Sequence, residues 1–214
     1  MRIVLLILLL LLWWWALSGS FSCAANYLII VGGLLLVFPV VWLGRKMVDK
    51  DPSLERLAWI TTFVHYAAAL LFFSAAFRAV VTHEDWPGPS LPVPTWIGSI
   101  LVIITSLAAL LAVLNLALKG LGAPFAIVLS KKLAVDWLYA WTRNPMVLGT
   151  LALLVSLGIW YQSTLFVLWA LLLFTPALLF FVKIYEEREL EIRFGESYLA
   201  YKARTPMIFP RRPK

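Results

Sequence analysis

The 214-residue chain has few of the residues that keep a protein of this size in water. Only 14% of its residues are charged and 63% are hydrophobic, so too little polar surface is available to coat a soluble globule. It contains one cysteine, Cys23, and two histidines, which excludes an internal disulfide and a metal site of the clustered Cys/His type. These shortages predict a membrane protein that holds no metal.

Six long apolar segments are each expected to form a helix. A helix needs roughly 20 apolar residues to cross a hydrocarbon core of about 30 Å. The six segments cover residues 3–17, 27–43, 57–81, 95–118, 146–160 and 164–182. The first is short and precedes small residues, as in a secretory signal, but we expect it to be retained as a helix. The sequence predicts an all-α, polytopic transmembrane bundle of about six helices with a cytosolic C-terminal helical tail, forming a single membrane domain over residues 1–214.

The basic residues predict which ends of the helices face the cytosol. When the six segments cross the bilayer alternately, 17 of the 18 lysine and arginine residues fall on one side, and Arg78 is the exception. Lysine and arginine concentrate in cytosolic loops, so both termini are predicted to be cytosolic. The net charge of +7 is then a topology signal and does not indicate a nucleic-acid partner. The basic residues 211–214 are expected to rest on anionic membrane lipids.

Polar residues inside the apolar segments are scarce. His65 lies within the third segment, and an ionisable group at such a position is a functional candidate. Since no second histidine matches its face, we interpret it as a hydrogen-bonded packing residue. No segment shows the interior charge pairs or breaks that are typical of a translocation path, so a transporter is disfavoured.

The stretch RNPMVLG, which begins at Arg143, opens the fifth apolar segment. Pro145 suits the first turn of a helix, where its missing N–H is harmless, and Asn144 before it is a plausible N-cap. Only residues 161–163 separate the last two segments, which must therefore form a tight hairpin. The hairpin returns the chain to the cytosolic side at residues 186–187, a pair of glutamates, so two distant charged clusters are expected to meet at the mouth of the bundle.

This order of motifs resembles a known family. The stretch RNPMVLG, a helical hairpin, the paired glutamates and a tail that reads FGESYLAYK from Phe194 are together similar to the C-terminal half of the isoprenylcysteine carboxyl methyltransferase and phospholipid methyltransferase superfamily. The resemblance covers residues 136–212, a methyltransferase-like, cofactor-binding half, whereas residues 1–120 contribute N-terminal helices. It implies a membrane enzyme that binds S-adenosylmethionine in a cytosolic pocket while a lipid-like or prenylated substrate enters from the bilayer.

The sequence departs from the family pattern Arg-His-Pro-x-Tyr-x-Gly at two positions. Asn144 replaces the histidine and cannot titrate, and Val147 replaces the tyrosine, so its hydroxyl is lost. The isoprenylcysteine enzymes also lead us to expect an arginine one turn before the paired glutamates. This chain has Phe181 and Val182 there, and Lys183 is the nearest cation.

The predicted site combines this resemblance with the chemistry of the residues. Methyl transfer needs the nucleophile and the methyl group held in line in a dry pocket. A cation can hold a carboxylate acceptor, and a carboxylate can orient an amine and accept its proton. The predicted catalytic residues are Arg143, Lys183 and Glu186. The predicted cofactor-binding residues are Asn144, Pro145, Gly149, Glu187, Tyr198 and Tyr201.

Two interpretations of the charged helix after residue 182 compete. By spacing alone, the acidic and basic residues from Glu186 to Arg193 form a solvated, salt-bridged face. The resemblance reverses this preference for Glu186 and Glu187 but not for Glu189 or Glu191. Tyr198 and Tyr201, three residues apart, also suit packing against the bundle.

We therefore predict an integral membrane S-adenosylmethionine-dependent methyltransferase with a lipid-like acceptor. A prenylcysteine-like carboxylate is favoured, and an aminophospholipid follows closely. One alternative is a membrane reductase of the steroid-reductase type that uses NADPH. Another is a membrane protein that has kept the scaffold without activity.

Overall fold

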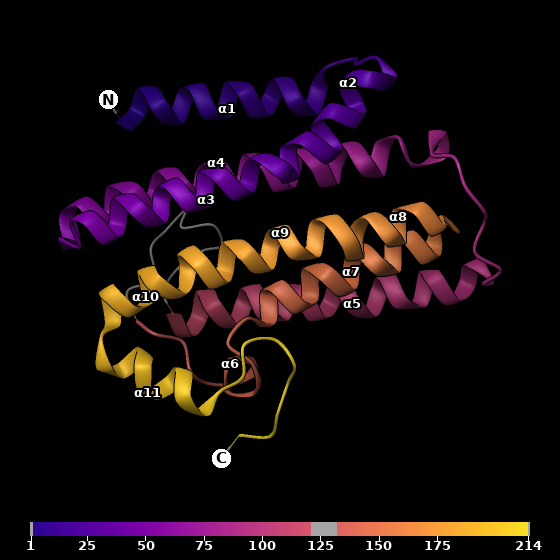
Figure 1. Ribbon diagram of the computed structural model, residues 1–214. Coiled ribbons are helices and arrows are strands. Elements are labelled where there is room, and N and C mark those ends of the chain that lie inside the picture. Colours follow the sequence, from indigo (N-terminus) through magenta and orange to yellow (C-terminus); the bar gives the residue numbers. More distant parts are fainter. Residues whose placement is uncertain (1, 121–131, 214) are drawn as a thin grey trace.

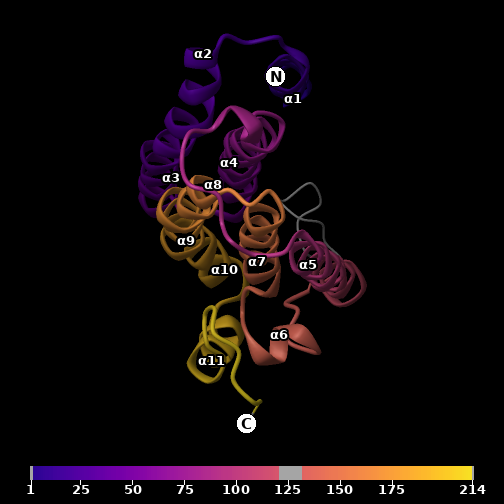
Figure 2. The ribbon, with the colours of Figure 1, turned by 90° about the vertical axis from the view of Figure 1, so that its right-hand side faces the viewer.

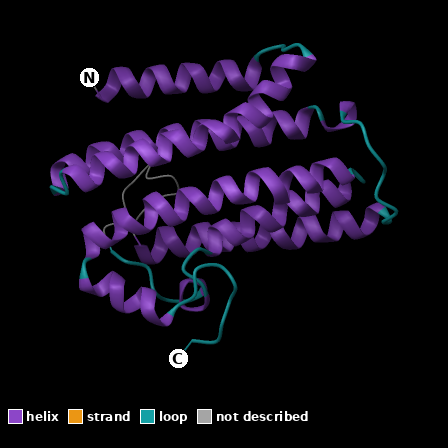
Figure 3. Ribbon diagram, in the orientation of Figure 1, coloured by secondary structure: helices purple, strands orange, loops and turns teal. Residues whose placement is uncertain are grey.

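The chain forms a bundle of helices, as its apolar segments predict (Figures 1 and 3). The computed structural model describes residues 2–120 and 132–213, and the only strand-like pairing there is an isolated bridge between Ser90 and Ser163. The α-helices are α1 (Arg2–Ser18), α2 (Cys23–Tyr27), α3 (Gly33–Lys50), α4 (Leu54–Val81), α5 (Thr95–Asn115), α6 (Leu138–Trp141), α7 (Pro145–Trp160), α8 (Thr164–Trp169), α9 (Thr175–Phe180), α10 (Glu187–Phe194) and α11 (Glu196–Arg204). Shorter turns are η1 (Leu28–Gly32), η2 (His83–Asp85), η3 (Leu116–Gly120), η5 (Ala170–Phe174) and η6 (Phe181–Glu186).

Several of these elements join into longer helices. The π-helical turns η1, η3, η5 and η6 continue the α-helices beside them without a break. Within the described residues, four helices are long and apolar enough to cross a membrane, namely Cys23–Lys50, Arg56–Val81, Thr95–Lys119 and Thr164–Phe194. α7 is apolar but shorter. The protein is therefore an integral membrane protein, and the all-helical class predicted from the sequence is confirmed.

Two helices run further than their apolar segments. The second predicted segment, 27–43, lies inside the helix Cys23–Lys50, and the sixth, 164–182, lies inside Thr164–Phe194. The added turns are rich in Glu, Lys and Arg, which are good helix formers but do not contribute to an apolar run. Hydropathy therefore marked the membrane-compatible part of each helix and not its end.

The α7–α8 hairpin has the predicted three-residue connection. Gln162 adopts a left-handed backbone conformation with φ of 55°, and the Ser163 hydroxyl caps α8 by accepting a hydrogen bond from the N–H of Phe166 (3.2 Å). α7 is also packed against α5, since a Cβ atom added to Gly149 would lie 3.0 Å from the Cα of Ala109. α7 is therefore held on both sides, which fixes the start of the helix.

The bundle is layered around the long helix Thr164–Phe194. Viewed along the helices, α1 lies at one edge beyond α4, and α5 lies at the opposite edge beside α7 (Figure 2). The core between α3, α4 and the part of the long helix from η5 to η6, which we call the α9 region, is apolar and tightly packed. Val37, Val41 and Ala75 are fully buried there.

The chain reverses after α10. Gly195 has a φ of 51°, a left-handed conformation that glycine adopts without steric cost, and α11 then runs back toward α6 (Figure 1). The Tyr201 hydroxyl in α11 donates a hydrogen bond to the carbonyl oxygen of Tyr139 in α6 (2.6 Å). The tail therefore lies below the beginning of α7.

The predicted topology can be tested with the single cysteine. Cys23 is exposed at the start of a 28-residue helix, and Ser53 is exposed in the turn beyond the other end, so the two lie on opposite sides of a bilayer that this helix crosses. We expect a membrane-impermeant maleimide to label Cys23 in intact cells, because the basic residues predict that this end faces outward. In a Cys23→Ser, Ser53→Cys variant, labelling should require permeabilised cells. The reverse pattern would contradict the predicted orientation.

Candidate active site

Arg143 lies at the entrance to α7 and is bound by the tail. Its Nη1 atom donates hydrogen bonds to the carbonyl oxygens of Lys202 (2.9 Å) and Thr205 (2.8 Å), and its backbone N–H donates to the carbonyl oxygen of Pro206 (2.8 Å). The side chain is 9% exposed. The guanidinium group is therefore oriented by backbone atoms about 60 residues further along the chain.

Glu187 forms the other half of this contact. It is 4% exposed and accepts a charge-assisted hydrogen bond from Nη2 of Arg143. Its Oε2 atom lies 2.8 Å from Nζ of Lys202. Although burial lowers the pKa of Lys202, hydrogen bonds to Glu187 and Glu191 outweigh this effect and raise the pKa above its usual value. One buried carboxylate thus joins the beginning of α7, α10 and α11.

Further backbone hydrogen bonds fix the tail beneath this ion pair. The Asn144 side-chain amide donates to the carbonyl oxygen of Met207 (3.0 Å), and the Thr142 hydroxyl donates to the same oxygen (3.0 Å). The N–H of Arg211 donates to the carbonyl oxygen of Trp141 (3.0 Å). Asn144 therefore acts in tail docking, and its side chain makes no N-cap hydrogen bond to α7.

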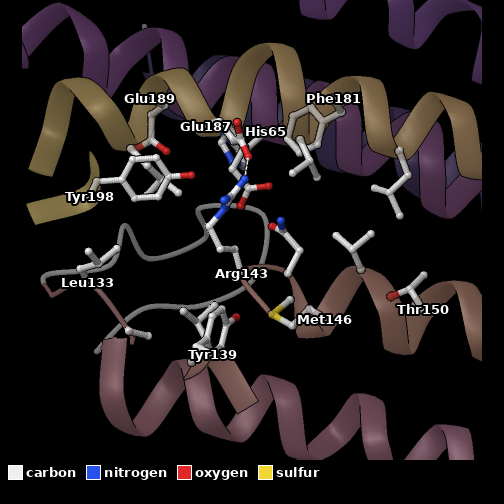
Figure 4. Close-up of a pocket in the computed structure, with 18 of the residues that line it drawn as sticks. His65, Leu133, Tyr139, Arg143, Met146, Thr150, Phe181, Glu187, Glu189 and Tyr198 are labelled. Carbon is white, nitrogen blue, oxygen red and sulfur yellow. Dashed lines mark hydrogen bonds and ion pairs between the residues drawn. The ribbon is translucent and has the colours of Figure 1, made fainter. Parts of the chain in front are cut away.

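A cavity of about 220 Å³ opens beside the ion pair (Figure 4). Its polar end is lined by residues from α6, the start of α7, the end of the long helix and α11. They include Tyr139, Asn144, Glu186, Glu189, Arg193 and Tyr198. Glu189 is buried and pairs with Arg193 (2.5 Å).

Glu186 differs from the other acidic residues of this wall. It is half-buried, lines the cavity, and has no hydrogen-bond or ion-pair partner among the residues that the structure describes. Glu187, by contrast, is neutralised by Arg143 and Lys202. The polar end of the cavity therefore presents one uncompensated carboxylate.

Three tyrosines complete this wall. Burial raises the pKa of Tyr139, Tyr198 and Tyr201 above the ordinary value, so their phenols remain protonated at physiological pH. The hydroxyl of Tyr201 is used in the contact to α6, and the ring of Tyr198 packs edge-on against that of Tyr201 at 6.2 Å. These contacts agree with the packing role that the spacing of Tyr198 and Tyr201 suggests.

The other end of the cavity is apolar. It is lined by α4, α7 and the α9 region, including Phe72, Leu154, Phe174 and Phe181. His65 lies between the two ends, and its Nδ1 atom lies 3.0 Å from the carbonyl oxygen of Thr61. Because a carbonyl oxygen only accepts, Nδ1 carries the proton, and Nε2 is left as an acceptor.

The structure brings most, but not all, of the predicted site residues together. Six of the nine line the cavity, namely Arg143, Asn144, Glu186, Glu187, Tyr198 and Tyr201. Lys183 is 59% exposed and lies 3.8 Å from Glu187 outside the lining. Pro145 is buried as the first residue of α7, and Gly149 faces α5. The structure therefore shows Pro145 at the start of a helix and Gly149 in a contact between two helices.

Several residues of the wall and of the ion pair beside it were not predicted from the sequence. The acidic residue Glu189 was assigned to a solvated face, and Lys202 and Tyr139 were not singled out. Glu189 lies three residues after Glu186, so helical periodicity already places the two on neighbouring faces. No pattern in the sequence pairs Lys202 with Glu187, because the contact depends on the reversal at Gly195.

Fold and site together define an integral membrane protein with a buried charged cavity at one end of its bundle. A family model described as phospholipid methyltransferase matches residues 93–197, which include α5, α7, the long helix and the start of α11. The matched family is one of the isoprenylcysteine and phospholipid methyltransferase superfamily, which is the superfamily that the motifs of this chain resemble. No curated protein and no solved structure matches the chain.

The role of Glu187 as a connection between elements gives a stability prediction. Glu187→Gln keeps the shape but leaves the charges of Arg143 and Lys202 without their shared carboxylate, which should lower the free energy of unfolding by about 3 kcal/mol. Thermal unfolding of the detergent-solubilised protein measures this loss. The control is Glu196→Gln on the exposed side of α11, which should change stability little. Equal stability of the two variants would show that the ion pair does not hold the tail.

Proposed function

We propose that the protein is an S-adenosylmethionine-dependent methyltransferase that methylates the amine of a lipid-like acceptor. The family match supports methyltransferase activity, and the observation that carries the choice of acceptor is Glu186. A carboxylate without a cationic partner, at the polar end of a cavity, attracts a protonated amine and can accept the proton that the amine must lose.

The occupancy of the cations argues against a carboxylate acceptor. Both Nη atoms of Arg143 are already engaged by protein oxygen atoms, and Lys183 lies outside the cavity lining. Arg193 is paired with Glu189, and Lys132, the remaining cation of the described lining, is exposed to solvent. The sequence favoured a prenylcysteine-like carboxylate because Arg143 and Lys183 were expected to hold it, and these contacts lead us to propose an amine instead.

The polar wall also suits the cofactor. S-adenosylmethionine carries an ammonium, a carboxylate, ribose hydroxyls and an adenine, and it supplies an electrophilic methyl group when bound. The protonated phenol of Tyr139 and the amide of Asn144 offer donors, and the acidic residues at the mouth offer acceptors for the ammonium and hydroxyl groups. These residue types fit the cofactor, and we propose Tyr139 and Asn144 as contacts.

The residues of the chain have three tasks in this reaction. Glu186 removes a proton from the acceptor ammonium, which frees the nitrogen lone pair for attack on the methyl carbon as the carbon–sulfur bond breaks. The apolar walls exclude water, so the acceptor nitrogen and the methyl group meet without a competing nucleophile. The Arg143–Glu187 pair holds the mouth in one geometry.

The location of the site follows from the predicted topology. The polar end of the cavity is lined by α6, α10 and α11. These elements lie at the end of the bundle that holds the C-terminal tail (Figure 1), which we propose to be the cytosolic face of a multi-pass protein. A mouth on the cytosolic face would admit S-adenosylmethionine from the cytosol. An amphiphile whose headgroup lies at this interface would reach the same mouth from the membrane.

The nature of the product distinguishes the candidate acceptors. Purified protein should transfer the labelled methyl group of S-adenosylmethionine to phosphatidylethanolamine and yield an N-methyl product that is stable to base. Farnesylcysteine analogues, which would yield a base-labile methyl ester, should react at least tenfold more slowly. Faster ester formation would restore the carboxylate acceptor. Binding of NADPH in place of S-adenosylhomocysteine would support the reductase alternative.

The proton-accepting role of Glu186 predicts a defect in the rate of transfer. Glu186→Gln should lower kcat by about 10² to 10⁴, because the amide cannot accept the proton, while affinity for S-adenosylhomocysteine changes less. Single-turnover transfer and calorimetric titration separate these two effects. Glu84→Gln, exposed near the far end of α4, serves as the matched control. An unchanged kcat, or a loss confined to cofactor affinity, would remove Glu186 from the proton-accepting role.

A further inference from the structure

The cavity extends far beyond its polar end. On the long helix, Glu186 and Phe174 both line the cavity and are twelve residues apart, which is roughly 18 Å at about 1.5 Å per residue. On α4, the lining residues His65 and Ala76 are eleven residues apart, or about 16 Å by the same rise. The two helices thus line similar lengths of the cavity.

Aromatic rings close the deep end. The ring centroids of Phe72 and Phe174 lie 5.2 Å apart, and that of Trp169 lies 5.5 Å from Phe174 on the side away from the mouth. The three residues, which we call the aromatic floor, are 2–4% exposed. Trp86 packs against Trp169 from the connection before α5, at 5.9 Å. The cavity therefore ends inside the bundle.

The wall between mouth and floor has the chemistry of a hydrocarbon site. Beyond His65, the cavity is lined by α4, α7 and the long helix, and Phe72, Leu154 and Leu178 represent the apolar residues of these three helices. We call this part of the cavity the arm. The hydroxyl of Thr150 is the exception in this part of the described lining. A group that enters this arm must be apolar, because nothing there would satisfy a charge.

We propose that the aromatic floor sets the length of the hydrocarbon tail that the acceptor can carry. The proposal rests on the proposed function for the headgroup and adds a limit on the tail. An extended chain advances roughly 1.25 Å per methylene, given carbon–carbon bonds of about 1.5 Å, so a depth of 16–18 Å corresponds to about 13 carbons. Each further carbon must stay outside the arm or displace packed rings.

The limit should be visible in binding alone. Each buried methylene strengthens binding by about fourfold, so affinity should rise along a homologous series until the tail reaches the floor and then stop rising. Alkylphosphoethanolamines with 8 to 20 carbons, used below their micelle-forming concentrations, are suitable probes. The rise in Tm of the purified protein reports their binding and requires no methyl transfer.

Substitutions at the deep end should move this limit in opposite directions. Phe174→Ala removes a ring from the floor and should lengthen the preferred tail by about three to four carbons, and Phe174→Leu should do so by about half as much. Ala76→Leu fills the deep end and should shorten the preferred tail by about two carbons. The control is Phe166→Ala, because Phe166 is fully buried and contacts Trp169 but does not line the cavity. It should lower Tm without moving the limit.

The binding series tests the role of the aromatic floor, and the methyl-transfer assay tests the proposed function, so either can fail without the other. A limit that stays near 13 carbons in the Phe174 and Ala76 variants, or that moves equally in Phe166→Ala, would overturn the role of the floor. Limits that shift as expected in a protein that methylates no amine would support the floor and overturn the proposed function. Methyl transfer to amphiphilic amines with one chain-length preference in every variant would support the function and overturn the floor.

Discussion

The buried ion pair between Arg143 and Glu187 is the contact on which the rest of the site depends. It joins the entrance of α7 to the end of the long helix, and Lys202 extends it to α11. Removing two charges from water is unfavourable, and this cost is offset by the backbone carbonyl groups that accept from Nη1 of Arg143 and by Lys202 beside Glu187, whereas Nε of Arg143 has no partner among the described residues. The three elements must therefore assemble together, and the mouth of the cavity takes one shape.

This arrangement divides the acidic residues into two groups. Glu187 and Glu189 have cationic partners and act in structure, whereas Glu186 faces the cavity without one. Two adjacent residues of the same helix thus have different roles. Glu187 stabilises the fold, and Glu186 is available to a ligand. The apolar arm beyond it continues toward the middle of the bundle, so headgroup and tail chemistry meet within one cavity.

The fold was largely predictable because helix length and hydropathy are local properties of the chain. The pairing of Arg143 with Glu187 was also accessible, since a hairpin as short as Tyr161–Ser163 returns the chain to the same end. The exposed position of Lys183 was not, because it depends on the helical phase through the π-helical turn η6. Gly149 was assigned by resemblance to the cofactor site, and only its packing against Ala109 shows a helix contact there.

The acceptors that surround Arg143 have a consequence for how this protein can vary. The carbonyl oxygens of Lys202, Thr205 and Pro206 belong to the backbone, as does that of Met207 beside Asn144. Every amino acid supplies such an oxygen, so substitutions along this segment leave the contacts in place while the path of the chain is kept. Natural selection would therefore preserve the side chain of Arg143, whereas in the tail segment it would preserve only the backbone conformation. Relatives of this protein are expected to share the arginine and to differ freely in the residues that hold it.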